Sequence, residues 1–240
     1  MRRPFPRWAL IICVPLLIAA CGRSGEHHKA YTPKIDPARF VAGVDNEFFP
    51  LVPGASYFYE EVGGGERVEV IVTDQTREVM GVPCIVVLSR EYQDGALAEE
   101  TRDWYAQDAD GNVWYFGEDN REYKDGEPVS TEGSWEAGRD GALPGIIMKA
   151  RPKVGASYRQ EYYPGQAEDM GEVVEVNDAA VVPYGSYTGV LVTREWTPLE
   201  PGAEEYKYYA PGVGLILEVE GEDRIELVRM TPAPIKTSAP

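Results

Sequence analysis

The sequence predicts an all-β protein built from antiparallel meander strands. Short runs rich in Val, Tyr, Ile and Trp are separated by the turn dipeptides Asp94-Gly95, Asp110-Gly111 and Asp125-Gly126. Asp-Gly between alternating apolar runs is a strong hairpin signal. Apolar residues alternate with a period of two in Val68-Val70-Val72 and Leu215-Leu217-Val219. Since no stretch has convincing helical periodicity, strands joined by short turns are expected from residue 40 onward.

Two segments of the chain, about 54–124 and 155–229, are similar enough to predict an internal duplication. GASYFYEE in the first faces GASYRQEY in the second, and later matches follow in the same order, with Ser89 opposite Thr193 and Tyr105 opposite Tyr209. The alternative is that two β-meanders resemble each other through shared turn chemistry. A few strands cannot easily bury an apolar face alone. The two units are therefore expected to form a sandwich or one curved half-barrel sheet.

Two further segments are predicted to cover the β domain. Residues 130–153 are glycine-rich, yet they contain Trp135 and the apolar run Ile146–Met148. Loops of such length are uncommon and often functional, so this connecting loop is expected to fold back and cap an open end. The apolar run Phe48–Leu51 precedes the first strand and is interpreted as a lid or plug on the core rather than a ligand site.

The N-terminus predicts a lipoprotein signal peptide over residues 1–20. Three arginines precede an uncharged run at 8–20, which is too short to span a bilayer comfortably as a helix. The run ends in Ile18-Ala19-Ala20-Cys21, which resembles the bacterial lipobox and implies cleavage before Cys21 and lipidation of its sulfur. An ordinary secretory peptide with an accidental cysteine is the alternative. Two or three acyl chains would anchor the protein stably in a membrane.

The predicted domain organisation and location follow from this anchor. Residues 21–39 comprise the lipidated Cys21 and a flexible tether, 40–229 the β domain, and 230–240 a disordered tail. Residue 22 is Gly rather than Asp, and in this respect the sequence resembles lipoproteins that are sorted to the outer membrane. The expected location is the cell envelope, and in a cell with two membranes the outer membrane, on its periplasmic side or surface.

The composition is strongly acidic, with 40 Asp and Glu against 23 Lys and Arg and a formal charge of −17. This balance argues against nucleic acid, whose phosphates need Lys and Arg, and against electrostatic adhesion to anionic lipid. It is compatible with cation binding. Only Cys84 remains in the β domain, so no intramolecular disulfide can form there, and a buried apolar role is expected for it.

Several enzyme classes are excluded by the residues that the β domain lacks. The only histidines, His27 and His28, belong to the tether. A Ser-His-Asp or Cys-His arrangement inside the domain is therefore excluded, as is an ordinary zinc centre. Hydrolysis by a Ser-Lys pair or by two carboxylates stays open, although no spacing singles out a pair.

Two constellations are candidate sites. Asp108, Asp110 and Asn112 alternate around Gly111, so their oxygens could hold calcium, but the pattern fails to match an EF-hand loop and a hairpin turn with solvent-facing acids is the simpler interpretation. A second candidate is aromatic. Trp104 and Trp114 lie in neighbouring predicted strands and Trp135 in the connecting loop; they could bind an apolar or sugar ligand, or simply pack.

Four stretches carry a family resemblance. FVAGVDNEFFPLVPG, DWYAQDADGNVWYFGED, GSWEAG and YYAPGVGLILEVE are similar to those of an uncharacterised family of secreted or lipid-anchored bacterial proteins, over nearly all of 40–229. That family has no assigned activity, so the resemblance implies an envelope location and nothing catalytic. The β-rich envelope context is also similar to half-barrel carriers of lipids and lipoproteins, which is an analogy of fold only.

The sequence favours a non-enzymatic, lipid-anchored envelope protein that binds a hydrophobic or glycan ligand, or another envelope protein, and needs no cofactor except, at most, calcium. A carboxylate-based hydrolase of an envelope polymer is one alternative, and a structural envelope component is another. An apolar cavity lined by strand residues would favour the first, two carboxyls facing each other across a cleft the second, and a filled interior with no cleft the third.

Overall fold

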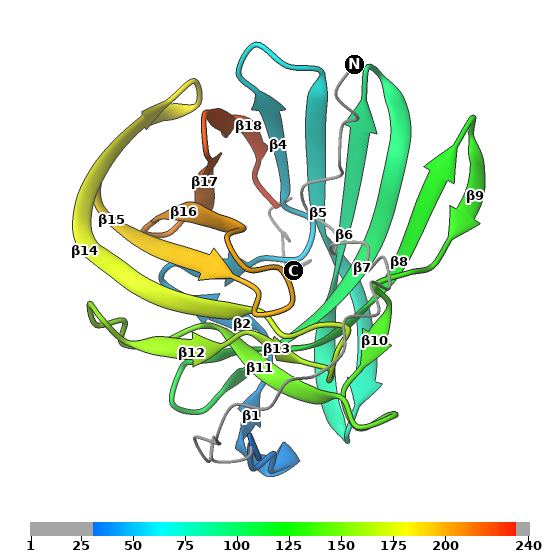
Figure 1. Cartoon of the computed structure of the whole chain (residues 1–240). Coiled ribbons are helices and arrows are strands. Elements are labelled where there is room, and N and C mark those ends of the chain that lie inside the picture. Colours follow the sequence, from blue (N-terminus) through cyan, green and yellow to red (C-terminus); the bar gives the residue numbers. More distant parts are fainter. Residues whose placement is uncertain (1–30, 234–240) are drawn as a thin grey trace, which may run out of the picture.

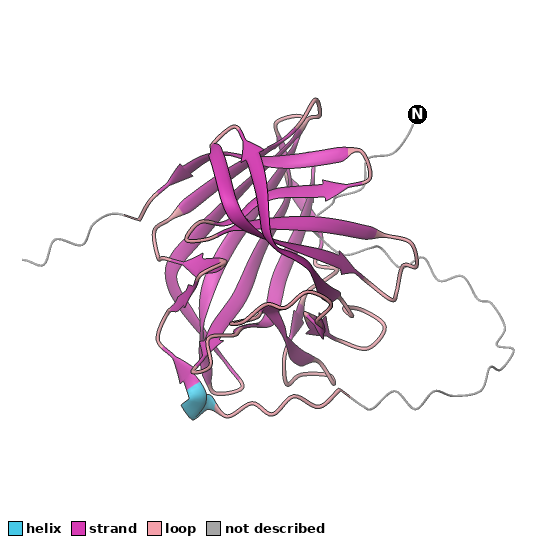
Figure 2. Cartoon of the chain, turned by 90° about the vertical axis from the view of Figure 1, so that its left-hand side faces the viewer, coloured by secondary structure: helices cyan, strands magenta, loops and turns pink. Residues whose placement is uncertain are grey.

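A computed structural model describes residues 31–233 of the chain. The predicted signal peptide, Cys21, the first half of the tether and the last seven residues lie outside this range. Strands dominate the described residues, and Figure 2 shows one short helical turn among them, η1 (Pro37–Arg39). The strands are β1 (Phe40–Val41), β2 (Val44–Asn46), β3 (Phe49–Leu51), β4 (Ser56–Glu61), β5 (Glu66–Val79), β6 (Val82–Gln93), β7 (Ala96–Asp108), β8 (Val113–Lys124), β9 (Glu127–Ser130), β10 (Trp135–Glu136), β11 (Leu143–Met148), β12 (Ser157–Arg159), β13 (Glu161–Tyr162), β14 (Met170–Val182), β15 (Gly185–Trp196), β16 (Glu204–Ala210), β17 (Gly214–Glu220) and β18 (Asp223–Thr231).

One antiparallel sheet of 16 strands curls into a nearly closed barrel, and β2 and β3 form a small second sheet. The order along the large sheet is β12-β14-β15-β16-β17-β18-β4-β5-β6-β7-β8-β11-β13. Its two ends, β12 and β13, are separated in the chain only by Gln160, so this segment pairs with β14 on one side and β11 on the other. The prediction of an all-β antiparallel fold is confirmed. Of the two predicted shapes, the curved sheet is the one observed.

The two predicted units form opposite sides of the barrel. Strands β4–β8 and strands β14–β18 face each other in Figure 1, and β18 pairs with β4 where they meet. Each unit contributes long hairpins, β5–β6 in the first and β14–β15 in the second. The internal duplication itself stays a prediction.

Side-chain alternation divides the buried residues into two clusters. On β6, Ile85 and Val87 belong to the cluster inside the barrel, which also contains Leu191 and Ile216. Cys84 and Val86 alternate with them and belong to a second cluster around Trp104, Phe116 and Trp135. Cys84 is fully buried, as expected of a small apolar residue. Where the second cluster covers the outside of the barrel, a strand such as β6 therefore has buried residues on both of its faces.

The connecting segment 130–153 extends the sheet instead of capping an open end. Strands β9, β10 and β11 pair one after another along the same edge of β8. Gly117 of β8 has a φ of +126°, and a Cβ there would lie 2.3 Å from the carbonyl oxygen of Trp135. Glycine is therefore required where β10 meets β8. Parts of the predicted connecting loop therefore form strands β10 and β11, which supply hydrogen-bond partners to this edge of β8.

The β2–β3 hairpin lies across one end of the barrel, in the place predicted for a plug. Backbone N–H groups of Asp45 and Asn46 donate to Oε1 of Gln107 at the end of β7. Gly212, in the β16–β17 turn, donates its N–H to the carbonyl of Glu47. The hairpin is thereby tied to both sides of the barrel, and Leu51 is buried within the core.

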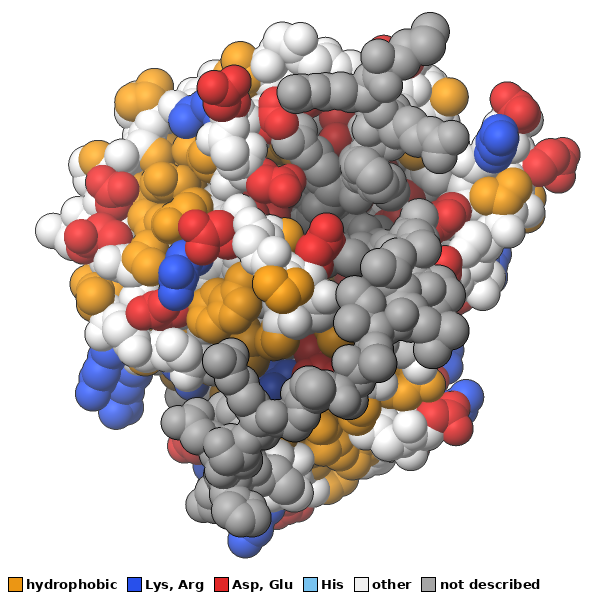
Figure 3. All heavy atoms as spheres, viewed as in Figure 1, with side chains coloured by type: hydrophobic (Ala, Val, Ile, Leu, Met, Phe, Trp, Pro, Cys, Tyr) orange, Lys and Arg blue, Asp and Glu red, His pale blue; other side chains and the backbone are white. Residues whose placement is uncertain are grey.

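Acidic side chains and hydrophobic side chains lie next to one another on the face seen in Figure 3. Within residues 31–233, no helix has the length and hydropathy that a membrane crossing requires.

Candidate ligand-binding site in the barrel lumen

A cavity of about 230 Å³ lies inside the barrel, and its wall changes character from one part to another. Seven carboxyl groups and five tyrosines line it, together with aliphatic residues from β3, β5, β6, β11 and β17. The aliphatic lining includes Leu51, Val70, Val72, Val87, Ile147 and Leu215. Because an apolar surface and a set of polar groups converge on one space, the cavity has the makeup of a small-molecule site.

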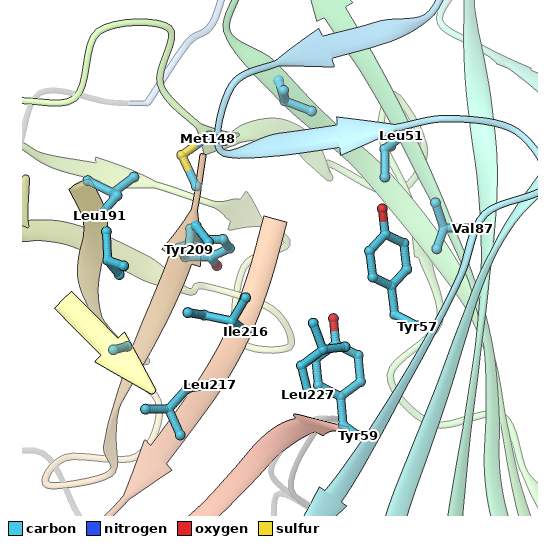
Figure 4. Packing of buried hydrophobic residues seen from close by; sticks show 14 of the residues in the cluster. Leu51, Tyr57, Tyr59, Val87, Met148, Leu191, Tyr209, Ile216, Leu217 and Leu227 are labelled. Atoms are coloured by element: carbon cyan, nitrogen blue, oxygen red, sulfur yellow. The ribbon is translucent and has the colours of Figure 1, made fainter. Parts of the chain in front are cut away.

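The apolar part of the cavity adjoins the β2–β3 hairpin. Tyr57 and Tyr59 alternate along β4 and point to the same side, with Tyr57 near Leu51 and Val87 and Tyr59 beside Leu227 (Figure 4). Phe49 packs edge-on against Tyr105 with ring centroids 5.2 Å apart. The hydroxyl of Tyr59 donates to the carbonyl oxygen of Leu215 at 3.0 Å. These contacts hold the aromatic side chains in place, so this end of the lumen is preformed.

The opposite part of the wall is acidic, because inward-facing positions of β6, β7 and β8 carry carboxyl groups. We call Glu91, Glu99, Asp103 and Glu118 the β6–β8 acid cluster. Strand register places Glu91 directly opposite Glu99, and Asp103 directly opposite Glu118. Like charges at directly opposed positions destabilise a sheet. The only basic residue among the described residues that line the cavity is Lys207, on the other side of the barrel.

Two carboxyl oxygens of this cluster lack hydrogen-bond partners among the described residues. They are Oε2 of Glu91 and Oε2 of Glu99, whose residues are only 2% and 3% exposed. Oε1 of Glu99 accepts from the hydroxyl of Thr101 at 3.0 Å. A buried carboxyl oxygen without a partner costs free energy, so each such group calls for a proton, a water molecule or a ligand.

Asp103 and Glu118 share a single phenol. The Tyr115 hydroxyl oxygen lies 2.7 Å from Oδ1 of Asp103 and 3.0 Å from Oε2 of Glu118. A phenol has one proton and can donate to only one of the two carboxylates. If both contacts are hydrogen bonds, a carboxyl proton must supply the second. The geometry therefore favours one shared proton on this pair.

The pKa values of the cluster shift in the direction that this geometry requires. Burial, reinforced by Glu99 and Glu66, raises the pKa of Glu91 well above its ordinary value. Burial raises the pKa of Glu99 to about 7, against the opposing hydrogen bond from Thr101. Burial also raises the pKa of Asp103 to about 6. Burial and then Asp103 hold the pKa of Glu118 well above the ordinary range. The cluster therefore retains protons at a pH where exposed carboxyls have lost them.

On the other side of the lumen, carboxyls surround an ammonium group. We call Glu195, Glu205, Glu218 and Lys207 the Lys207 cluster. Nζ of Lys207 lies 3.0 Å from Glu195, 2.7 Å from Glu205 and 4.0 Å from Glu218. Burial alone would lower the pKa of Lys207, but these three carboxyls outweigh it and raise the pKa well above its ordinary value. The surrounding carboxyls therefore favour the charged form of the ammonium.

A third set of polar groups comes from the segment that closes the barrel. Gln160, Glu161 and Asp169 all line the cavity. The backbone N–H of Gln160 donates to the carbonyl of Asp169 at 2.8 Å, while its side-chain Nε2 has no acceptor among the described residues. Burial, followed by Asp169 and Glu118, raises the pKa of Glu161 well above its usual value. The closing segment thus links the two acidic sides.

The structure places the three candidate tryptophans away from the cavity lining. Trp104 and Trp135 are buried in the second hydrophobic cluster, and Arg77 stacks over Trp104 at 4.1 Å from the ring centroid. Trp114 packs edge-on against Phe40. Their role as ligand-binding residues stays a prediction, while their contacts are those of packing residues.

The Asp108 turn is held together by its own hydrogen bonds. Oδ1 of Asp108 accepts from the backbone N–H groups of Asp110 and Asn112, and Oδ2 accepts from Trp114 Nε1 at 2.8 Å. Burial alone would raise the pKa of Asp108, but these hydrogen bonds prevail and lower it. Asp110 forms an exposed ion pair with Arg39 at 2.7 Å. No group of three His, Cys, Asp or Glu within residues 31–233 is arranged to hold a metal ion. Calcium binding stays a hypothesis.

Comparisons with known proteins add little to this picture. No protein-family model matches the chain, and no curated protein matches it. Among solved structures, the chain is similar to a protein of Parabacteroides distasonis that is described as a putative lipoprotein, with 10% identity and a TM-score of 0.42. The similarity covers 78% of this chain and 99% of that one. A TM-score this low supports no conclusion about fold or function, so the resemblance to an envelope family stays a prediction.

Proposed function

We propose that the protein is a lipid-anchored protein of the bacterial cell envelope that binds a small ligand inside its barrel. The anchor rests on the lipobox-like residues 18–21, which lie outside the described residues. The binding function rests on the cavity, whose apolar and acidic parts converge on one space. The observation that carries it is the pair of buried, unpartnered oxygens of Glu91 and Glu99.

The size of the cavity limits the ligand. The cavity offers about 230 Å³. Ligand pockets for drug-sized molecules are typically about 300–1,000 Å³. The ligand, or the part of it that enters the lumen, is therefore a small organic group and not a polymer segment.

Native mass spectrometry of the full-length protein, purified in detergent from its own envelope, tests this function. We expect a co-purifying small molecule that is released on denaturation. Val70→Phe would fill the lumen, because Val70 lines the cavity, and should abolish the adduct. The neighbouring Glu69→Phe substitution is the matched control, because Glu69 does not line the cavity. Equal adducts in both variants, or none in the wild-type protein, would contradict ligand binding in the lumen.

One observation keeps the hydrolase as a second candidate. Asp103 and Glu118 meet at a single phenol, and their raised pKa values suit a general acid next to a second carboxyl. A cavity of about 230 Å³ suits a small substrate better than an envelope polymer. Turnover of small aryl glycosides by the wild-type protein, lost in Glu118→Gln, would favour this reading over simple binding.

A further inference from the structure

We propose that the lumen ligand is an organic amine whose ammonium group sits between Glu91 and Glu99. This inference rests on the proposed ligand-binding function and names the chemical class of the ligand. It is carried by three observations: the unpartnered carboxyl oxygens, the arrangement of the Lys207 cluster, and the aromatic wall beside the acids.

The first observation is the charge imbalance across two paired strands. Glu91 and Glu99 lie directly opposite each other on β6 and β7, and both are almost fully buried. Each has an Oε2 atom without a hydrogen-bond partner among the described residues. A cation with several N–H donors would satisfy both oxygens at once, and would turn repulsion between the two carboxylates into attraction.

The second observation is that, on the other side of the lumen, an ammonium group lies among closely spaced buried carboxyls. Thr193 of β15 pairs with Lys207 of β16, whose Nζ contacts the surrounding carboxyls. Ser89 of β6, which the predicted internal alignment places opposite Thr193, pairs instead with Thr101 of β7. The strand partner of Ser89 is therefore a threonine where the strand partner of Thr193 is a lysine, and the alignment that sets Tyr105 opposite Tyr209 sets the carboxyl of Asp103 opposite Lys207. A ligand ammonium would supply the cation that the first side of the barrel lacks.

The third observation is the surface next to the acids. Tyr57, Tyr59, Tyr105, Tyr115 and Tyr209 all line the cavity. Tyrosine faces attract cations, and aromatic and aliphatic walls bind the apolar part of a ligand. A bare metal ion would leave this wall without a role. On β6, the lining residues run from Val87 through Ser89 to Glu91, a span of about 13 Å at 3.3 Å per residue, so the ligand has one apolar end and one cationic end.

An ammonium group of this kind can belong to a free amine or to the headgroup of an aminophospholipid. Isothermal titration calorimetry on the full-length protein in phosphatidylcholine nanodiscs, with empty nanodiscs as the blank, tests the shared chemistry. The probes are n-hexylamine, n-hexanol and hexanoate, which have nearly the same size and differ in charge. We expect n-hexylamine to bind at least tenfold more tightly than the other two.

Substitutions locate the ammonium. Glu91→Gln and Glu99→Gln should each weaken n-hexylamine binding about tenfold or more, the loss expected when a hydrogen bond to a charged partner is removed. Glu60→Gln, on the exposed side of β4, removes the same charge without touching the cavity and should leave binding unchanged. Thr101→Lys would place a tethered ammonium in the lumen and should abolish n-hexylamine binding, while the melting temperature shows whether the variant is folded.

The possible outcomes distinguish failure of the amine proposal from failure of the proposed ligand-binding function. If n-hexanol binds as tightly as n-hexylamine, or if both Gln variants keep the wild-type preference, the amine proposal is overturned while ligand binding stands. If no probe binds at all, both fail. Replacing phosphatidylcholine by phosphatidylethanolamine identifies the source of the ammonium. Competition with n-hexylamine would support a lipid headgroup, and unchanged binding would support a free amine; either result keeps the ammonium site.

Discussion

The two sides of the barrel lumen both contain buried carboxyl groups, but they differ in the hydrogen-bond donors that these carboxyls meet. In the Lys207 cluster, Glu195 accepts hydrogen bonds from Thr193, Lys207 and Tyr209. In the β6–β8 cluster, Glu91 has no such donor for its Oε2 atom. The first side therefore has its own counter-ion, and only Oε2 of Glu218 in that cluster lacks a hydrogen-bond partner among the described residues. The second side has no cation among the described residues that line the cavity, so it needs a proton or a ligand. The comparison indicates that structure and function are divided between the two sides.

This division has a thermodynamic consequence. A buried ion pair is costly to break, because removing one partner leaves a buried charge without compensation. A buried acid without a partner is itself a cost, which natural proteins retain where function needs it. The Lys207 cluster is thus expected to stabilise the fold, and the β6–β8 cluster to weaken it.

The largest expected effect comes from Lys207→Met. This substitution leaves Glu195, Glu205 and Glu218 without the ammonium they surround, and should lower the free energy of unfolding by about 3–5 kcal/mol at pH 8. Urea unfolding of the full-length protein measures this loss of stability. Lys124→Met, at an exposed position at the end of β8, is the matched control. The cost should shrink at pH 5, where carboxyls accept protons. A cost equal to that of the control would mean that the two clusters do not differ.

The next effect is the pH dependence of stability. Because Asp103 and Glu99 have pKa values of about 6 and 7 in the folded protein, they bind protons there that the unfolded chain has already lost. The protonated forms of Asp103 and Glu99 stabilise the folded protein, and this stabilisation is fully present below about pH 4 and is lost as the pH rises through 7. The free energy of unfolding should therefore fall by roughly 3 kcal/mol between pH 5 and pH 8. The ionisable groups that act on Glu99 and Glu91 from β5, β6, β7 and β8 are all acidic: Glu66, Glu91, Glu99, Asp103 and Glu122.

Urea unfolding at several pH values measures this slope. Glu99→Gln should flatten it above pH 5, while Glu60→Gln should not. A wild-type stability that rises steadily from pH 5 to pH 8 would contradict the protonated state of the β6–β8 cluster.

A third effect distinguishes the clusters by sign. Glu91→Gln replaces an unpaired buried acid by a neutral group of the same shape and should raise the free energy of unfolding by about 1–2 kcal/mol at pH 8. Glu195→Gln is the same substitution in the Lys207 cluster and should lower it, because Glu195 pairs with Lys207. Melting temperatures of the two variants provide the measurement. If the melting temperatures of both variants shifted in the same direction, the proposed difference between the Lys207 cluster and the β6–β8 acid cluster would be contradicted.

The smallest effect concerns acids outside the lumen. Asp110 is 71% exposed where it pairs with Arg39, so Asp110→Ala should change the free energy of unfolding by less than about 0.5 kcal/mol. The same variant tests the calcium hypothesis. A rise in melting temperature with millimolar calcium that disappears in Asp110→Ala would support a calcium site at this turn, and an equal response of both proteins would count against it.

Much of the fold is readable in the sequence, while the lumen is not. The Asp-Gly turns and the alternation in Val68-Val70-Val72 indicate the strands and their order, because both are local signals. The acids at Glu91 and Glu99 look like solvent-facing residues, since a strand with polar groups on both faces has no apolar side to mark the interior. Only the closure of the sheet, through pairing of β13 with β11 and β12 with β14, turns these acids inward.

The predicted tryptophans illustrate the same limit. Trp104 and Trp114 lie on neighbouring strands, as expected, yet the segment that contains Trp135 continues the sheet beside β8 and covers Trp104 within the second hydrophobic cluster. Tyrosines line the cavity instead. The signal that could have found the site is the alternation Glu99-Thr101-Asp103-Tyr105, read as an inward face of a closed sheet.

The pairing of β18 with β4 also governs when the barrel can be completed during synthesis. Ile225 pairs with Glu61, so nearly the whole domain must be synthesised before the edge of β4 is covered. Until then, β4 presents an unpaired strand edge, which is a template for pairing with other chains. Contacts so distant in the chain also slow folding. A chain with this topology needs protection from aggregation until its last strand has been synthesised.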